Sequence, residues 1–390
     1  MAIEGRGDNA LGKIKYGMVG GGEGAFIGAV HRLAARMDDH YELVAGALSA
    51  SPEKAIRSAK ALGLAEDRCY ADYQAMATAE KAREGGIEAV AIVTPNHVHV
   101  PASIAFLKAG IHVICDKPLA TSLKDALALE RLVRSSGLVF CLTHNYTGYP
   151  MVRHARQMVA EGALGDVRIV QVEYPQDWLT EPIEKSGQKQ AAWRTDPKQS
   201  GGGAIGDIGT HAHNLAAFVT GLDLESLLAD VDTFVKGRKV DDNVNVLLRY
   251  KGGAKGMLWA SQVAVGNENN AKLRVYGTKG GIEWHQEHPN HLRWFPYGKP
   301  EELITRGSPA SNLAAGRVTR VPPGHPEGYL EGFANIYTEA AHAIRAARAK
   351  KKVDKAVLYP TVGDGVKGMA FIEAVLKSSA RGGKWVKLAV

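Results

Sequence analysis

Asp207 and His211 are the side chains whose types and spacing best suit acid–base chemistry in this sequence. They are four residues apart, so on a helix they lie on one face, one turn from each other. A carboxylate beside an imidazole orients the ring and tunes its proton affinity near neutral pH. The same pair also serves as a surface or capping contact on ordinary helices, so it does not establish an active site alone.

The residues before this pair favour a site. Ser200 is followed by three glycines, after which a helix is predicted to begin and to run through Val219. Glycines allow a ligand to approach the backbone closely. The sequence therefore predicts that a ligand lies beside this helix start.

A lysine provides a second reactive group. Asp116-Lys117-Pro118 follows the predicted strand His112–Cys115, and a lysine at such a strand end can polarise a substrate oxygen or shuttle a proton. The strand Ala89–Thr94 ends in another polar turn, which runs to His99. Ligands bind at the carboxyl ends of parallel strands, so we expect both turns to face a ligand.

A glycine-rich turn links the first predicted strand to a helix. This arrangement holds the pyrophosphate of a dinucleotide against backbone N–H groups at the helix N-terminus. Gly20 and Gly22 fit the first two positions of the glycine pattern. The third position is assigned to Gly28, with Ala25 as the alternative.

The end of the second strand bears on the choice of cofactor. An Asp or Glu there would hydrogen-bond the ribose 2′-hydroxyl of NAD, and the segment 46–52 contains neither. Ser49, Ser51, Lys54 and Arg57 would suit the 2′-phosphate of NADP, or they face solvent at the start of a helix. NAD and NADP both stay open.

The elements that must position these groups form two regions. Residues 13–147 alternate short apolar strands with amphipathic helices, which predicts a doubly wound parallel sheet. The predicted strands are Lys15–Val19, Glu42–Leu48, Ala89–Thr94, His112–Cys115 and Val139–Leu142. The predicted helices are Ile27–Met37, Pro52–Leu62, Tyr73–Arg83, Val100–Ala109 and Leu123–Ser135.

Residues 148–390 follow a different pattern and predict an α+β domain, while residues 1–12 are assigned as a tail. Period-two alternation and the turn at Lys251 indicate an antiparallel sheet whose open outer face suits subunit contacts. The predicted strands are Val167–Tyr174, Leu227–Val235, Val244–Tyr250, Gly256–Val265, Leu273–Tyr276, Gly281–His285 and Lys384–Ala389. Residues 297–325 are predicted to be a long loop, and the predicted helices are Met151–Glu161, Tyr329–Ala347 and Thr361–Ala380.

Composition narrows the class of protein. With 390 residues, 45% hydrophobic and 23% charged, the chain is typical of a two-domain soluble enzyme. Its three cysteines show no metal-type spacing, and no signal peptide or apolar run of membrane-spanning length is recognisable, so we expect a cytoplasmic protein. The net charge of +7 includes a basic cluster from Arg345 to Lys355, which we interpret as a solvated helix end and not as a nucleic-acid site.

Three stretches together carry a resemblance. The glycine turn that ends Ile-Gly-x-x-His31, the turn Asp116-Lys117-Pro118, and Gly-Asp207-Ile-Gly-x-His211 resemble the glucose–fructose oxidoreductase/inositol dehydrogenase (Gfo/Idh/MocA) family. The resemblance covers nearly the whole chain after residue 13. It implies an N-terminal Rossmann domain, a second domain with a large, mostly antiparallel sheet, and dimers or tetramers that form through that sheet.

The resemblance also implies a reaction. Lys117, Asp207 and His211 match the family's catalytic set, in which a ring carbinol gives its hydride to nicotinamide and its proton to the enzyme. Whether Lys117 or His211 takes the proton directly is left open. The segment from Trp193 to Gly203 looks most like the branch that oxidises cyclic polyols and sugars, with inositols leading and rare hexoses or anhydrosugars as alternatives. Asp116 stands where the family usually has Glu, and the first glycine loop is longer than usual.

The remaining candidates are contacts to cofactor and substrate. Predicted cofactor contacts are Gly20, Gly22, Gly28, Ser49, Lys54, Thr94, Asn96, His99, Asp116, Lys117 and Arg194. Predicted substrate contacts are Lys117, Asn145, Tyr146, Tyr174, Trp193, Asp207, His211 and His325, with His213 as a weaker one. No metal site is predicted, because His97, His99, His211 and His213 belong to motifs with other roles. The alternatives to a dehydrogenase are a cofactor-sensing regulator and an NAD-dependent glycosidase on the same scaffold.

Overall fold

A computed structural model describes residues 12–389 of the chain, so nearly all of the tail assigned to residues 1–12 lies outside the described residues. The chain forms two compact units, and both are discontinuous in sequence. Among the described residues, the first contains 12–120, 124–148 and 329–365, and the second contains 121–123, 149–328 and 366–389. Residues 329–365, which the sequence analysis assigned to the second region, thus join the first unit.

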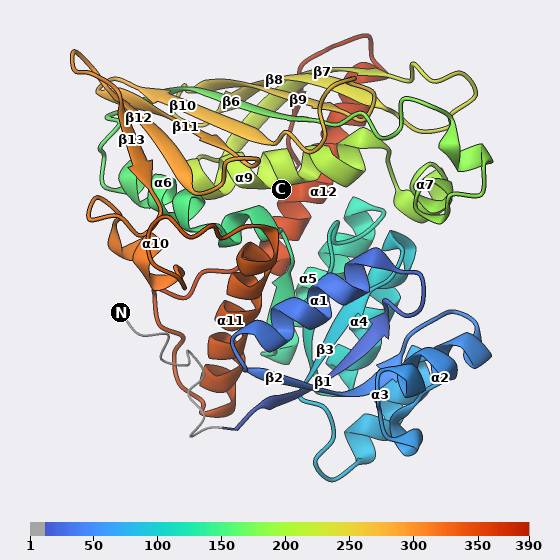
Figure 1. The fold of residues 1–390 in the computed structure, drawn as a ribbon. Coiled ribbons are helices and arrows are strands. Elements are labelled where there is room, and N and C mark those ends of the chain that lie inside the picture. The colour runs from blue at the N-terminus through green and yellow to red at the C-terminus, as the bar shows by residue number, and fades with distance from the viewer. Residues whose placement is uncertain (1–11, 390) are drawn as a thin grey trace. The chain divides into compact units, whose positions relative to one another are not determined.

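The first unit is built on a five-stranded parallel sheet in the order β2-β1-β3-β4-β5 (Figure 1). Its strands are β1 (Ile14–Gly20), β2 (Tyr41–Ala47), β3 (Ala89–Val93), β4 (His112–Cys115) and β5 (Phe140–Leu142). These strands are apolar and mostly buried, because helices cover both faces of a parallel sheet. The predicted doubly wound sheet is confirmed.

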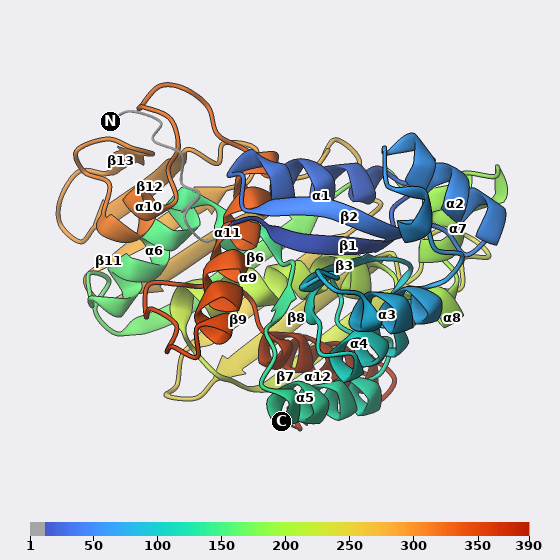
Figure 2. The same ribbon diagram turned by 90° about the horizontal axis from the view of Figure 1, so that it is seen from below.

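The helices between these strands lie close to the predicted ranges. They are α1 (Phe26–Met37), α2 (Pro52–Ala61), α3 (Tyr73–Ala82), α4 (His99–Lys108) and α5 (Leu123–Ser136). Figure 2 shows α1 on one face of the sheet and α3 and α4 on the other. The strand order reverses between β1 and β3, and such a switch point opens a crevice for a ligand at the strands' carboxyl ends.

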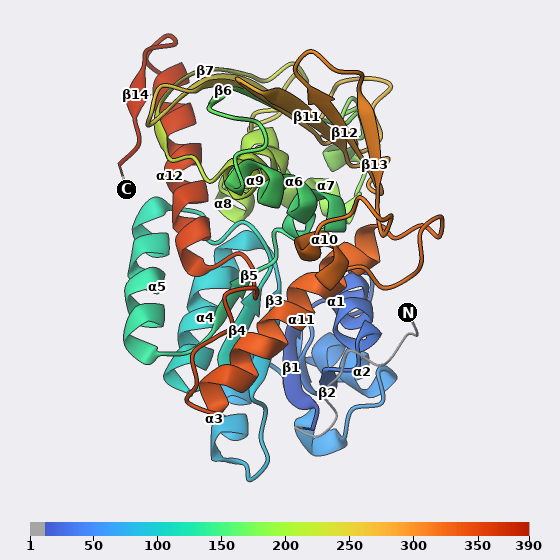
Figure 3. The same cartoon turned by 90° about the vertical axis from the view of Figure 1, so that its left-hand side faces the viewer.

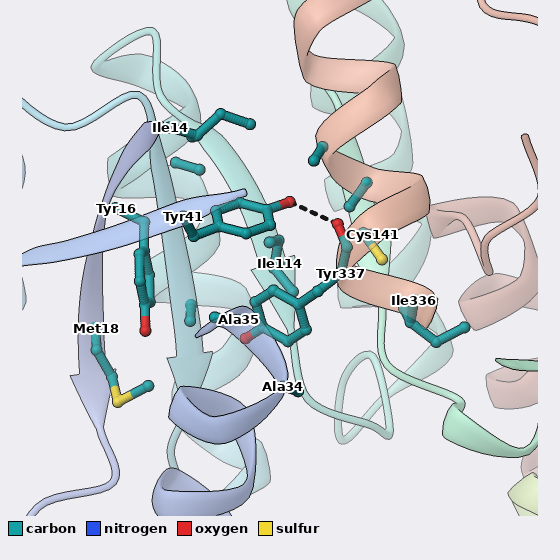
Figure 4. Close-up of a cluster of buried hydrophobic side chains, with 14 of the residues drawn as sticks. Ile14, Tyr16, Met18, Ala34, Ala35, Tyr41, Ile114, Cys141, Ile336 and Tyr337 are labelled. Carbon is teal, nitrogen blue, oxygen red and sulfur yellow. Dashed lines mark hydrogen bonds between the residues drawn. The ribbon is translucent and has the colours of Figure 1, made fainter. Parts of the chain in front are cut away.

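Helix α11 (Tyr329–Arg348) packs against α1 and completes the core of the first unit. In Figure 4 the Tyr41 hydroxyl from β2 donates to the backbone oxygen of Tyr337 on α11, over 2.8 Å. The basic cluster at the end of α11 is not wholly solvated, because Arg345 is buried and its Nη1 lies 2.8 Å from His40 Nδ1. For Arg345 the interpretation as a solvated residue was therefore wrong.

The second unit is built on a nine-stranded mixed sheet in the order β13-β12-β11-β10-β6-β9-β8-β7-β14. All neighbouring strands are antiparallel except β6 and β9, which are parallel. The strands are β6 (Val167–Pro175), β7 (Leu224–Asp232), β8 (Asn243–Tyr250), β9 (Lys255–Ser261), β10 (Lys272–Gly277), β11 (Gly280–His285), β12 (His291–Pro296), β13 (Glu302–Thr305) and β14 (Val386–Lys387). Figure 3 shows helices on one face of this sheet, with the other face open.

The helices of the second unit are α6 (Pro150–Ala160), α9 (Thr210–Thr220) and most of α12 (Val362–Ser379), with the shorter α7 (Lys189–Arg194), α8 (Pro197–Ser200) and α10 (Leu313–Arg317). The short helices were not predicted, and α10 and β13 interrupt the segment expected to be a long loop. Each of these elements has six residues or fewer, which is too short for a clear hydrophobic period. Within residues 12–389 no helix has the length and apolarity needed to cross a membrane.

Candidate active site

The glycine turn between β1 and α1 forms a tight backbone cradle in the first unit. Gly20 and Gly21 have φ of +76° and +71°, which other residues rarely adopt. A Cβ on Gly28 would lie 2.3 Å from the backbone oxygen of Gly21, so helix and turn touch without side chains. A Cβ on Gly22 would lie 2.6 Å from the backbone oxygen of Leu48, so the turn also lies against the end of β2.

The sequence analysis chose Gly20, Gly22 and Gly28 for the glycine pattern but missed Gly21. Gly21 makes the close approach to Gly28 in the structure. A run of three glycines offers several registers, and only the folded turn identifies the one that faces α1.

A dinucleotide fits this cradle. The N-cap residue Ala25 supplies no side-chain cap, and the first turn of α1 contains no acidic residue, so its backbone N–H groups can receive an anion. Thr94, after β3, lies beside Gly20, and its buried Oγ1 has no hydrogen-bond partner among residues 12–389. A buried hydroxyl without a partner is costly, which suits a position that a bound ligand completes.

The end of β2 carries a mixed set of charges. Arg57 of α2 donates to Glu23 Oε2 from Nε and Nη2 over 3.3 and 3.0 Å. Glu23 N in turn lies 3.2 Å from the Ser58 hydroxyl, which fixes the glycine turn against α2. Ser49 accepts a hydrogen bond from Ser51 N, and Lys54 is half-buried in the first turn of α2. A carboxylate thus accompanies the cations that were predicted to suit a 2′-phosphate.

Asp116 organises the backbone at Lys117. Its Oδ1 accepts from Lys117 N over 2.9 Å and from the Thr143 hydroxyl over 3.0 Å. His31 Nε2 lies 3.9 Å from the same oxygen, while His31 Nδ1 is 2.7 Å from the Tyr337 hydroxyl. Burial alone would raise the pKa of Asp116, but the nearby His31, Lys117 and His99 hold it well below its usual range. Although Asp116 is one carbon shorter than the glutamate that is usual in the resembling family, its carboxylate therefore still accepts hydrogen bonds from Lys117 N and the Thr143 hydroxyl.

His99 has a structural role at the same strand ends. It is fully buried, and its two ring nitrogens lie 2.7 Å from Pro118 O and 3.0 Å from Thr94 O. Burial lowers the pKa of this ring, and a neutral imidazole has one N–H, so one contact at a time is a hydrogen bond. The ring thus links the turns after β3 and β4, and its predicted contact with the cofactor stays a prediction. Asn96 is also buried in this turn.

The second unit holds Asp207 and His211 in one continuous helical segment. Residues Ile205–Gly209 form a π-turn that leads into α9 at Thr210. The sequence analysis expected an α-helix here, but an i→i+5 turn is wider, and such turns often occur at functional sites. Asp207 and His211 remain about one turn apart.

Asp241 fixes the backbone in front of this turn. Its two carboxylate oxygens accept from Gly203 N and Ile205 N over 2.8 and 2.7 Å. A Cβ on Gly203 would lie 1.8 Å from the backbone oxygen of Asp241, so the glycine is required there. Gly203 thus allows its backbone to lie against the backbone of Asp241. The sequence analysis did not identify this reason for the run of glycines.

The Asp207 carboxylate has a hydrogen bond and an ion pair to side chains of the second unit. Gln262 Nε2 donates to Oδ2 over 2.9 Å, and Arg194 Nε lies 3.4 Å from the same oxygen. His211 is 7% exposed, and its ring centroid lies 6.3 Å from that of Tyr174 on β6. A carboxylate about one helical turn from a buried imidazole suits proton transfer.

The other substrate candidates differ in their surroundings. Asn145 is 2% exposed and its Nδ2 has no hydrogen-bond partner within residues 12–389, which favours a ligand contact. Trp193 stacks on Arg194, whose guanidinium carbon is 4.4 Å from the ring centroid. Tyr146 and Tyr174 are buried, and Tyr174 donates to Asn269.

The two remaining histidines face other surroundings. His213 stacks on Phe371 with ring centroids 4.4 Å apart, so its side chain is part of the core. His325 is exposed in the segment after α10, where its backbone oxygen accepts from Arg306.

Sequence reasoning missed Gln262, Asp241 and Trp178. Trp178 lies beside Arg194, with the guanidinium carbon 6.0 Å from its ring centroid. These residues belong to no short motif, and a glutamine or aspartate after a strand resembles any loop residue. Within residues 12–389 no group of three or more His, Cys, Asp or Glu side chains could hold a metal ion.

Comparisons with known proteins agree with this geometry. Residues 14–144 match the model of an oxidoreductase family with an NAD-binding Rossmann fold, and residues 152–283 match the GFO/IDH/MocA C-terminal domain. An oxidoreductase structure from Sinorhizobium meliloti is 57% identical, with a TM-score of 0.88, and the match covers 96% of this chain and 99% of that chain.

Two relatives have informative names. A structure of an inositol dehydrogenase homolog from Azotobacter vinelandii, complexed with NADH and myo-inositol, is 35% identical. It has a TM-score of 0.91, and the match covers 96% of this chain and 97% of that one. The levoglucosan dehydrogenase of Pseudarthrobacter phenanthrenivorans is 27% identical, with 94% of this chain and 96% of that protein covered.

The glycine cradle, the parallel sheet and these matches define an NAD(P)-dependent oxidoreductase. The chain belongs to the Gfo/Idh/MocA family of oxidoreductases. The predicted fold class, cofactor type and family are confirmed.

Proposed function

We propose that this protein oxidises a ring hydroxyl of a cyclic polyol, with inositols as the leading substrates and NAD as the hydride acceptor. The observation that carries the proposal is the Asp207 carboxylate, held by Gln262 and Arg194 one turn from the buried His211. Such a pair suits removal of a hydroxyl proton. The myo-inositol bound to the Azotobacter relative supports the substrate class.

In the proposed mechanism His211 is the acid–base group and Asp207 balances the charge of its ring. Lys117 holds the reacting oxygen, and its backbone is fixed through Asp116. The nicotinamide supplies the acceptor for the hydride, and the described residues supply binding, orientation and proton handling.

NAD is proposed over NADP because of Glu23. Its carboxylate pairs with Arg57, the cation that would otherwise be free for a 2′-phosphate, and it adds a negative charge beside the end of β2. Like charges close together disfavour binding. The NADH bound to the Azotobacter relative supports the same choice.

We also propose that a second copy of the chain covers the outer face of the nine-stranded sheet. Leu228, Leu247 and Met257 form a cross-strand row on that face, and the latter two are 46% and 45% exposed. A shallow cavity of about 280 Å³ lies over this row. Exposed apolar rows on an open sheet favour association.

One experiment tests the proposed reaction. Purified protein is incubated with NAD or NADP and a panel of inositols, aldohexoses and anhydrosugars, and reduced-cofactor absorbance is followed. We expect turnover with a ring polyol and NAD, and a loss of about 10²–10⁴-fold in kcat for His211→Ala with NADH binding retained. Turnover confined to levoglucosan-type anhydrosugars would replace the substrate class, and wild-type kcat in His211→Ala would refute the acid–base role.

A further inference from the structure

Asp207 Oδ2 has an ion pair with Arg194 and a hydrogen bond from Gln262. Arg194 brings a charge, but its side chain is 24% exposed and its Nε–Oδ2 distance is 3.4 Å. Gln262 brings a neutral amide, which is 2.9 Å from the same oxygen. Solvent screens the ion pair with Arg194, whereas the buried Gln262 amide keeps its geometry, so the two contacts contribute differently.

Gln262 is held firmly on its own backbone. The residue is 2% exposed and directly follows β9. Its N donates to Asp242 O over 2.8 Å, and its O accepts from Leu179 N over 3.1 Å. Both neighbours belong to other segments of the second unit, so the backbone that carries the side-chain amide is fixed from two sides.

We propose that Gln262 is a positioning residue for Asp207 in the proposed reaction. A hydrogen bond to the ionised form of a carboxylate favours that form and fixes the free rotation of its oxygens. With Oδ2 held by the amide, the orientation of the carboxylate relative to His211, one turn further along the chain, is set before substrate binds. The inference therefore rests on the function proposed for Asp207 and His211.

The role predicts a particular kinetic change. Gln262 acts through Asp207 and not on the substrate itself, so its loss lowers kcat more than it raises KM. Hydrogen bonds to charged groups have typical strengths that correspond to about 10–100-fold in rate. Binding of NADH, which depends on the first unit's glycine cradle, stays within about twofold.

The experiment compares Gln262→Leu with Gln199→Leu. Gln199 also donates its amide to a carboxylate in the second unit, Asp196 Oδ2 at 2.8 Å, so it is a matched control for loss of such a bond. We expect kcat on the ring polyol to fall about 10–100-fold in Gln262→Leu only. Melting temperature and NADH affinity are measured for both variants.

A second variant separates positioning from folding. Gln262→Glu keeps the shape but replaces the amide donor by a carboxylate that repels Asp207, so its kcat should fall at least as far as that of Gln262→Leu. Wild-type kcat in either soluble variant, or an equal loss in Gln199→Leu, would overturn the proposal. A wild-type protein inactive on every ring polyol would instead count against the proposed function.

Discussion

The close contact between Gly28 and Gly21 predicts that the variant Gly28→Ala binds NADH more weakly and is less stable than the wild type. The new methyl group would lie 2.3 Å from the backbone oxygen and 2.4 Å from the Cα of Gly21. Neither atom belongs to a flexible side chain, so the turn must move away from α1. The atoms that move are those that form the cradle for the cofactor.

Two opposing effects set the size of the change. Alanine improves helix propensity by about 1 kcal/mol over glycine. Forcing an extra methyl into a packed contact costs about 1–3 kcal/mol, so the free energy of unfolding falls by up to about 2 kcal/mol. Displacing a backbone N–H from a phosphate removes a charge-assisted hydrogen bond of about 1.5–3 kcal/mol, which weakens NADH binding about 10–100-fold.

The assay combines fluorescence titration of NADH with chemical denaturation of the cofactor-free protein. Gly316→Ala is the control, because Gly316 also lies in a helix, α10, and a Cβ there would meet nothing within 4 Å. The control should bind NADH normally and be at least as stable as wild type. Normal NADH affinity in Gly28→Ala would refute the view that this contact shapes the cofactor site.

Burial lowers the pKa of His213 from 6.5 to about 4. As the pH falls, His213 therefore takes up a proton in the unfolded chain before it does so in the folded one, and the free energy of unfolding decreases between about pH 6.5 and 4. In denaturant titrations at several pH values, His213→Gln should reduce the slope of the unfolding free energy against pH by up to about 1.4 kcal/mol per pH unit, and an unchanged slope would contradict this role of the buried ring. Glu23→Gln should raise the affinity for NADP relative to NAD about 2–5-fold, whereas the control Glu53→Gln should leave this ratio of affinities unchanged. The same ratio in both variants would exclude a role for the Glu23 charge in the choice of cofactor. Leu247→Lys should shift light-scattering mass towards the monomer, and an unchanged mass would count against the outer sheet face as the interface.

Much of the fold was predictable because its signals are local. Apolar runs separated by amphipathic stretches identified the five parallel strands, and period-two alternation identified most of the large sheet. The short elements α7, α8 and α10 were missed, since a few residues do not show a period. The motif residues Lys117, Asp207 and His211 were recognisable because each lies within a short pattern.

The sequence by itself determined the type of each long element, the glycine turn and the family, because these depend on neighbouring residues. Only the tertiary structure decided that α11 returns to pack on α1, through Tyr337 and His31 306 residues apart. It also decided that Gln262 reaches Asp207 across 55 residues and that Asp241 fixes Gly203 across 38. The physical reason is that a buried donor or acceptor needs a hydrogen-bond partner. Which partner is within reach depends on how the whole chain packs, and not on the neighbouring residues in the sequence.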